Sequence, residues 1–161
     1  MKHTFFCLKY PGECKVDKIV FRGGPVRLTA KRWAELARFN AAVNRAITPQ
    51  PNTRGLAGET WLILSKSGGC HDCAVIKRHE LRALGWPERD LLLSEVGTTW
   101  RKHHLVLVIR TSDGDFVADN LNPKIRRWSK TPISGFAFNR PAMRRYGRPW
   151  QAPRSGRRFP G

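Results

Sequence analysis

A pair of glycines directly before a cysteine, Gly68-Gly69-Cys70, stands at the start of the clearest amphipathic segment in the sequence. Apolar side chains recur at helical spacing over residues 70–84, and Gly85 followed by Pro87 is a strong signal for a helix end. The pattern therefore predicts a helix that begins at Cys70. Because glycine lets the backbone turn sharply and carries no side chain, the sulfur of Cys70 should be uncrowded.

The rest of the chain predicts one more helix and a set of strands. Thr29 is the expected N-cap of the helix, and apolar residues follow it at helical spacing until Pro49. The expected strands cover residues 18–21, 91–96, 104–109 and 116–121, with a turn at 112–115 and a strand or helical turn at 61–64. Two helices followed by a sheet indicate an α+β fold. From Pro123 onward Pro, Arg and Gly dominate, and no element is assigned.

The chain is strongly basic. Its 161 residues hold 30 Lys and Arg against 12 Asp and Glu, a formal charge of +18, and residues 140–161 contain seven Arg and no acidic residue. A positive field attracts nucleic acid, anionic membranes or an acidic protein substrate, but a solvated basic surface explains the charge equally well. The length suits one domain and a monomer, so we place a domain at 1–139 and a basic tail at 140–161.

The compartment stays open at this stage. No run approaches the ~18 apolar residues that a membrane-spanning helix needs, and the first residues lack the features of a signal peptide. The chain would be cytoplasmic if this N-terminus is native, and periplasmic or secreted if it is a mature form. Cys7 and Cys14 lie in a loop-like segment that contains Pro11. They suit a disulfide in an oxidising compartment, or two inert thiols in a reducing one.

Cys70 is placed where a thiol can become a nucleophile. The thiolate is the reactive form, so the pKa of the thiol must fall well below ~8.5. The unpaired N–H groups and the dipole of a helix N-terminus favour an anion, and a neighbouring imidazolium favours it further. The backbone N–H of Cys70 would also be a natural donor to an oxyanion.

His104 and Asp119 are the candidate base and orienting acid. His104 begins an apolar strand, and Asp119 lies on the next strand, beyond a tight turn. If residues 111 and 116 close this hairpin, the two side chains share a face, but Asp119 then stands opposite Val108. A bulge near Gly114, or a longer loop, would bring His104 and Asp119 together.

Three separate segments resemble one family, the bacterial transglutaminase-like cysteine peptidases. Residues 69–78, GCHDCAVIKR, are similar to the family's G-D-C-E-D-Y-A-x-x-K-R signature. His104-Leu105-Val106-Leu107 resembles its H-A-V-L strand, and Ala118-Asp119-Asn120-Leu121 resembles its L-D-N-L. Upstream, Val43-Asn44-x-x-Ile47 is similar to its V-N-x-x-I. The resemblance covers roughly residues 5–130.

The resemblance implies a papain-like, transglutaminase-like fold, in which a helix carrying the nucleophile packs on an antiparallel sheet. It implies acyl transfer on a protein or peptide substrate, with Cys70 as nucleophile, His104 as base and Asp119 as orienting acid. Protease, deamidase and transglutaminase share the first half of that reaction, and protease is favoured because the matched motifs are those of peptidases. Around the triad we expect supporting or substrate-contacting residues at Trp61, Gly69, His71 and Asn120.

The chain departs from the family pattern beside the nucleophile. Gly69 and His71 replace the acidic residues that flank the cysteine and help to bind calcium in calcium-dependent relatives. Calcium prefers several hard oxygen ligands, and Asp72 alone makes a poor cage. We therefore expect no calcium requirement, no other cofactor and no metal site. The usual tyrosine is Cys73, whose thiol could form a disulfide with Cys70 and switch the enzyme off.

Three rival interpretations remain. C-x-x-C at a helix start is how thioredoxin-like proteins present their thiols, but no strand–helix–strand order surrounds it. Four cysteines and a basic surface would suit a zinc-bearing nucleic-acid module, but their spacing is not a standard ligand spacing. A catalytically inactive relative that only binds an acidic partner or nucleic acid is the third.

Overall fold

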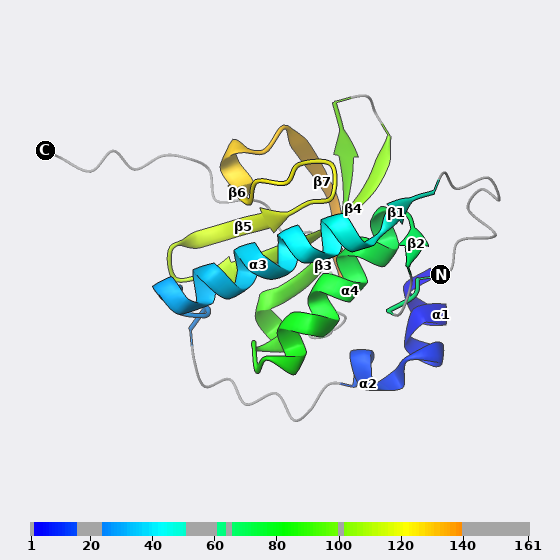
Figure 1. Cartoon of the computed structure of the whole chain (residues 1–161), viewed down its shortest axis with the longest axis horizontal. Coiled ribbons are helices and arrows are strands. Elements are labelled where there is room, and N and C mark those ends of the chain that lie inside the picture. The colour runs from blue at the N-terminus through cyan, green and yellow to red at the C-terminus, as the bar shows by residue number, and fades with distance from the viewer. Residues whose placement is uncertain (1, 16–23, 51–60, 64–65, 100–101, 140–161) are drawn as a thin grey trace, which may run out of the picture.

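The structure, a computed structural model, describes residues 2–15, 24–50, 61–63, 66–99 and 102–139, with the backbone alone for 134–139. Two long helices, α3 (Ala30–Ala46) and α4 (Cys70–Ala83), cross in front of a five-stranded sheet, as Figure 1 shows. The sheet is antiparallel and its strand order is β6-β5-β4-β3-β7. Its strands are β3 (Leu91–Thr98), β4 (His103–Thr111), β5 (Gly114–Ala118), β6 (Arg126–Arg127) and β7 (Ile133–Asn139). The predicted α+β, papain-like class is confirmed.

Several short elements complete the chain. Helices α1 (Lys2–Lys9) and α2 (Pro11–Cys14) precede α3. A two-stranded parallel pair joins β1 (Thr48–Pro49) to β2 (Ser67–Gly68) just before α4. Two 3₁₀ turns, η2 (Glu88–Asp90) and η3 (Trp128–Lys130), flank the sheet strands. No helix among the described residues combines the length and apolar character that crossing a bilayer requires.

Apolar side chains of β3 and β4 point alternately to the two faces of the sheet, and both faces are buried. Leu93, Leu105 and Leu107 pack with Val75 and Leu81 of α4 in the main core. The alternate residues of the same strands face the other side of the sheet, where they form a second cluster with β5: Leu92, Val96, Val106, Val108 and Val117. Apolar residues on both faces explain why these strands read as nearly continuous apolar runs in the sequence.

The two helices begin as their sequences predict. The side-chain oxygen of Thr29 accepts a hydrogen bond from the backbone N–H of Arg32 at 3.2 Å, which caps α3. Helix α4 starts at Cys70 and ends one residue before the expected Leu84, and Gly85 adopts a left-handed φ of 79° after it. Helix α3 packs along α4 through Val43, Ile47 and Cys73.

Some expectations were wrong or fall elsewhere. Residues 61–63 form neither a strand nor a helical turn, and the strand expected at 18–21 lies outside the described residues. The strand expected at 116–121 ends at Ala118, because the carboxylate of Asp119 accepts the N–H of Leu121 at 3.0 Å and turns the chain. Strands β6 and β7 form after Pro123, where no element was assigned from the sequence.

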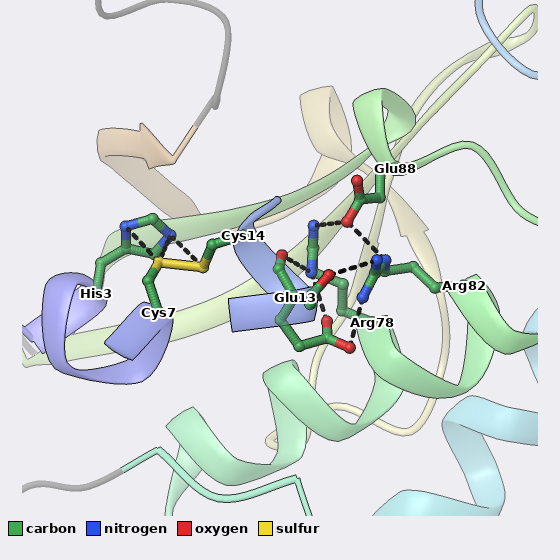
Figure 2. Close-up of a disulfide and its surroundings, with 8 residues drawn as sticks. His3, Cys7, Glu13, Cys14, Arg78, Arg82 and Glu88 are labelled. Atoms are coloured by element: carbon green, nitrogen blue, oxygen red, sulfur yellow. Dashed lines mark hydrogen bonds and ion pairs between the residues drawn. A yellow bond between two sulfur atoms is a disulfide. The ribbon is translucent and has the colours of Figure 1, made fainter. Parts of the chain in front are cut away.

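The segment around Cys7 and Cys14 is helical rather than loop-like. Pro11 occupies the first turn of α2, where its missing N–H costs nothing, and a disulfide joins Cys7 of α1 to Cys14 of α2. The imidazole of His3 lies 3.6 Å from the sulfur of Cys7 (Figure 2). Helices this short are marginal on their own, so the disulfide and tertiary contacts must hold them.

Glu13 supplies the main polar contact between this N-terminal segment and α4. Its buried carboxylate lies 2.7 Å from Arg78 and 2.5 Å from Arg82 (Figure 2). It also lies 2.8 Å from His79. Glu88 contacts the same two arginines from the other side, at 3.1 and 2.6 Å. A guanidinium buried as deeply as that of Arg78 needs such partners, so the network fixes α2 against the helix that carries Cys70.

Candidate active site

The loop before Cys70 is held by the carboxylate of Asp72. One oxygen of Asp72 accepts the backbone N–H of Gly69 at 3.0 Å, and the other accepts the N–H of Leu62 at 2.8 Å. A Cβ atom at Gly68 would collide with this carboxylate, whereas a Cβ atom at Gly69 would meet nothing within 4 Å. Residue 68 must therefore be glycine because the carboxylate of Asp72 approaches it closely, whereas residue 69 has room for a side chain.

The thiol of Cys70 is partly buried at the first position of α4. Burial alone would raise its pKa, but hydrogen bonds with His104 and His71, the charge of His71 and the backbone of Leu105 outweigh burial and lower the pKa to about 6. At neutral pH the sulfur is therefore mostly a thiolate, the form that attacks carbonyl carbon and alkylating agents.

His104 projects from β4 and is buried. Its Nε2 lies 2.6 Å from Oδ1 of Asp119, which leaves Nδ1 as the ring nitrogen for Cys70. Burial lowers the pKa of His104, but the hydrogen bonds with Asp119 and Cys70 outweigh it and raise the pKa to about 9. Burial also opposes ionisation of Asp119, yet the bonds from His104 and Leu121 hold the pKa of that carboxyl below its usual range.

The hairpin reaches this geometry without a bulge or a longer loop. Thr111 pairs with Gly114 rather than with residue 116, so the turn contains only Ser112 and Asp113. The ladder then runs to the pair of Leu107 and Ala118, and Asp119 is the next residue after the strand. The expected register was wrong by two residues. A shift of two residues leaves each side chain on the same face of the sheet, so His104 and Asp119 still share a face as expected.

Two polar side chains from the helices hold Asp119 by its backbone. Nδ2 of Asn44 and Nζ of Lys77 donate hydrogen bonds to the carbonyl oxygen of Asp119 at 2.9 and 3.0 Å. Burial lowers the pKa of Lys77 to about 8, and the negative charge of Asp119 offsets part of this effect. Neither residue was expected to have a role in the site. A lysine and an asparagine on the apolar faces of two helices are the signal that could have found them.

Trp61 and His71 form a stacked pair next to Cys70. Their rings are 5.7 Å apart with an interplanar angle of 14°, and Nδ1 of His71 lies 3.7 Å from the sulfur of Cys70. Trp61 is buried and also contacts Phe6 and His3 of α1. Among the described residues its Nε1 has no hydrogen-bond partner.

The other predicted residues are less engaged. Asn120 is half-buried beside Asp119, and among the described contacts its Oδ1 has no partner. Cys73 is a free, buried thiol one turn along α4, and burial raises its pKa. It packs with Val43 and Ile47 of α3, and no disulfide joins it to Cys70.

The residues around Cys70 do not suit calcium. Both oxygens of Asp72 already accept backbone N–H groups, and Gly69 and His71 offer no carboxylate. Within the part of the chain that the structure describes, the three-residue cluster of metal-ligand type is His3, Cys7 and Cys14, whose two sulfurs are bonded to each other. Neither place offers the oxygen-rich cage that calcium prefers.

A helix that begins with a cysteine and packs on an antiparallel sheet is the architecture of papain-like and transglutaminase-like thiol hydrolases. Residues 1–148 match the family model described as bacterial transglutaminase-like cysteine proteinase, and the chain belongs to this family. The predicted family, the bacterial transglutaminase-like cysteine peptidases, is thereby confirmed. No curated protein matches the chain.

Solved structures of Legionella pneumophila LapG share the fold. The calcium-bound form superposes with a TM-score of 0.57 at 23% identity, covering 64% of this chain and 62% of that one. The EGTA-treated form gives a TM-score of 0.56 at 23% identity, with 64% and 60% covered. The match thus spans less than two thirds of the LapG chains, and this level of identity supports the fold alone.

Proposed function

We propose that this chain hydrolyses peptide bonds through a triad of Cys70, His104 and Asp119. The observation that carries the proposal is the 2.6 Å contact between His104 and Asp119, next to a thiol whose pKa is lowered to about 6. A thiolate paired with an imidazolium whose pKa is raised to about 9 gives an ion pair across the neutral range.

In the first half-reaction the Cys70 thiolate attacks the carbonyl carbon of a peptide bond. The negative charge that develops on oxygen lies near the first turn of α4, where the N–H of Cys70 has no partner within the helix. The imidazolium of His104 gives its proton to the leaving nitrogen, the C–N bond breaks, and a thioester remains on Cys70.

In the second half-reaction water replaces the departed amine. His104, now neutral, takes a proton from the water as the water attacks the thioester carbon. The C–S bond breaks, the thiolate returns, and the carboxylic acid product leaves. Asp119 keeps the imidazole in the orientation that both proton transfers need, and Asn44 and Lys77 keep Asp119 in place through its carbonyl oxygen.

The experiment compares the wild-type protein with Cys70→Ala on a denatured mixture of cellular proteins to which a primary amine probe is added. A peptidase produces new peptide N-termini with the wild type only. A deamidase converts glutamine to glutamate without new N-termini, and a transglutaminase incorporates the amine. Either of the last two results would replace the peptidase proposal, and no change in any of the three would contradict acyl transfer as such.

The remaining assignments extend this proposal. We infer that residues 1–139 form the catalytic unit and that 140–161 form a basic tail that favours acidic substrates, although the family match reaches residue 148. A monomer suffices for the triad, since one chain supplies all three residues. The Cys7–Cys14 disulfide supports an oxidising compartment such as the periplasm.

A further inference from the structure

The nucleophile has a second imidazole beside it, from the residue that follows it in the chain. Nδ1 of His71 lies 3.7 Å from the sulfur of Cys70, within the range of hydrogen bonds to sulfur. The thiol is therefore contacted by His104 of β4 and by His71 of its own helix. The triad uses only the first of these, so the second contact needs its own explanation.

The position of His71 is fixed by packing. Its ring is stacked on Trp61 at 5.7 Å and nearly parallel to it, at 14°. Trp61 is itself buried, and it packs against Phe6 of α1. A first-turn histidine that served only as a solvated surface residue would not be half-buried against an indole ring in this way.

We propose that His71 is a second hydrogen-bond donor to the Cys70 thiolate, with its Nδ1–H aimed at the sulfur by the stack on Trp61. The inference rests on the proposed function, because it concerns the same nucleophile. A donor to a thiolate stabilises the charged form and lowers the pKa of the thiol. The carboxylate that the family pattern carries at this position would do the opposite, by repulsion between like charges.

The consequence is a nucleophile that does not depend on His104 alone for its charge. When the C–S bond breaks in the second half-reaction and the thiolate returns, His71 again donates to the sulfur. The titratable groups that act on this sulfur are His104 from β4, and His71 and Cys73 from α4. Cys73 is a buried thiol with a raised pKa, so it is neutral at the pH values that matter here.

Two substitutions separate the donor from the stack. His71→Phe keeps an aromatic ring on Trp61 and removes the N–H group. His71→Asn loses the ring, but its side-chain amide can place an N–H group close to the position of Nδ1. His71→Ala, which lacks both, is the reserve if His71→Phe does not fold. The rate of alkylation of Cys70 by iodoacetamide, measured from pH 4.5 to 9 with mass spectrometry of each thiol, reports the pKa of Cys70 directly.

We expect His71→Phe to raise the apparent pKa of Cys70 by about one unit, and His71→Asn to raise it by clearly less. Starting from a pKa of about 6, one unit reduces the thiolate fraction and the alkylation rate at pH 6 about fivefold. An unchanged profile in His71→Phe, or in His71→Ala if that variant is used, would overturn the inference. Equal shifts in the Asn and Phe variants would also overturn it, because shape rather than the N–H group would then be responsible.

The result is separable from the proposed function. If the wild-type Cys70 reacts no faster at pH 6 than an ordinary thiol, the proposed function itself fails. If Cys70 reacts fast, loses that reactivity in His104→Ala and keeps it in His71→Phe, the triad stands and only the role of His71 is rejected.

Discussion

His104 and Asp119 are joined by a 2.6 Å contact, although Asp119 lies beyond the last residue of its strand. The contact depends on a hairpin that closes at Thr111 and Gly114, and on an Asp119 carboxylate that also accepts the N–H of Leu121. The acid is thus positioned by three separate features: the tight turn, the backbone N–H of Leu121, and the donors Asn44 and Lys77 on its carbonyl oxygen.

Asp119→Asn should leave the fold in place and reduce peptide hydrolysis by about 100-fold or more. The amide can still contact His104, but it lacks the charge that raises the pKa of the imidazole, so the Cys70–His104 ion pair is weakened. Turnover of a cleaved peptide is the measurement. Asp113→Asn, on the exposed turn of the same hairpin, is the matched control. Equal loss in both variants would show that charge on the hairpin, rather than the contact with His104, is responsible.

Lys77→Met should change how stability depends on pH. The folded pKa of Lys77, about 8, lies below its ordinary 10.5, so between these values the unfolded chain binds more protons and the wild type gains stability as pH rises. Without Lys77 that gain is lost. We expect the free energy of unfolding of the wild type, relative to Lys77→Met, to increase by up to about 3 kcal/mol from pH 7 to pH 11. Urea unfolding at four pH values measures it, and parallel curves would contradict a lowered pKa of Lys77 in the folded protein.

Gly68→Ala and Gly69→Ala should behave differently although they are neighbours. The new Cβ at residue 68 collides with the carboxylate of Asp72, so the loop before Cys70 must move, at a cost of about 1–3 kcal/mol in unfolding free energy. The Cβ at residue 69 meets nothing, and the φ of −97° there suits any residue. We expect alkylation of Cys70 to slow only in Gly68→Ala. If Gly68→Ala and Gly69→Ala had equal effects on the melting temperature and on the alkylation rate of Cys70, the role given to Asp72 would be contradicted.

Calcium should neither stabilise nor activate this chain. Both carboxylate oxygens of Asp72 already accept backbone N–H groups. Gly69 and His71, the residues before and after Cys70, carry no carboxylate. We expect the thermal midpoint and the alkylation rate of Cys70 to be the same in millimolar calcium and in EGTA. A rise in the midpoint by several degrees with calcium would indicate a site, since ligands that bind only the folded state stabilise it.

Much of this site can be predicted from the sequence because its signals are local. The glycine pair, the helical spacing after Cys70 and the apolar run after His104 each lie within one element, so periodicity reveals them. The register of the hairpin was wrong by two residues because the sequence Ser112-Asp113-Gly114-Asp115 does not state where the turn closes. Here Thr111 Oγ1 accepts the N–H of Asp113 and donates to the carbonyl of Gly114, which selects the tight closure.

Other features depend on contacts between distant residues. Lys77 and Asn44 meet Asp119 across 42 and 75 positions of sequence, and such contacts have no periodicity to reveal them. Helices α1 and α2 are too short to be predicted from propensity. They are held by the Cys7–Cys14 disulfide and by the ion pairs between Glu13 of α2 and the arginines of α4. His71 was placed near the nucleophile by its sequence position, but its stack on Trp61 depends on the fold.

The most direct test of the central claim is the reaction of the wild-type protein with iodoacetamide at pH 6, with the modified thiols mapped by mass spectrometry. The buried Cys73, whose pKa is raised, is the internal control. We predict fast and selective modification of Cys70, because ordinary thiols are almost wholly protonated at that pH, and much slower modification in His104→Ala, where only His71 remains to stabilise the thiolate. Modification of Cys70 no faster than that of an unfolded reference thiol, or unaffected by His104→Ala, would contradict the account.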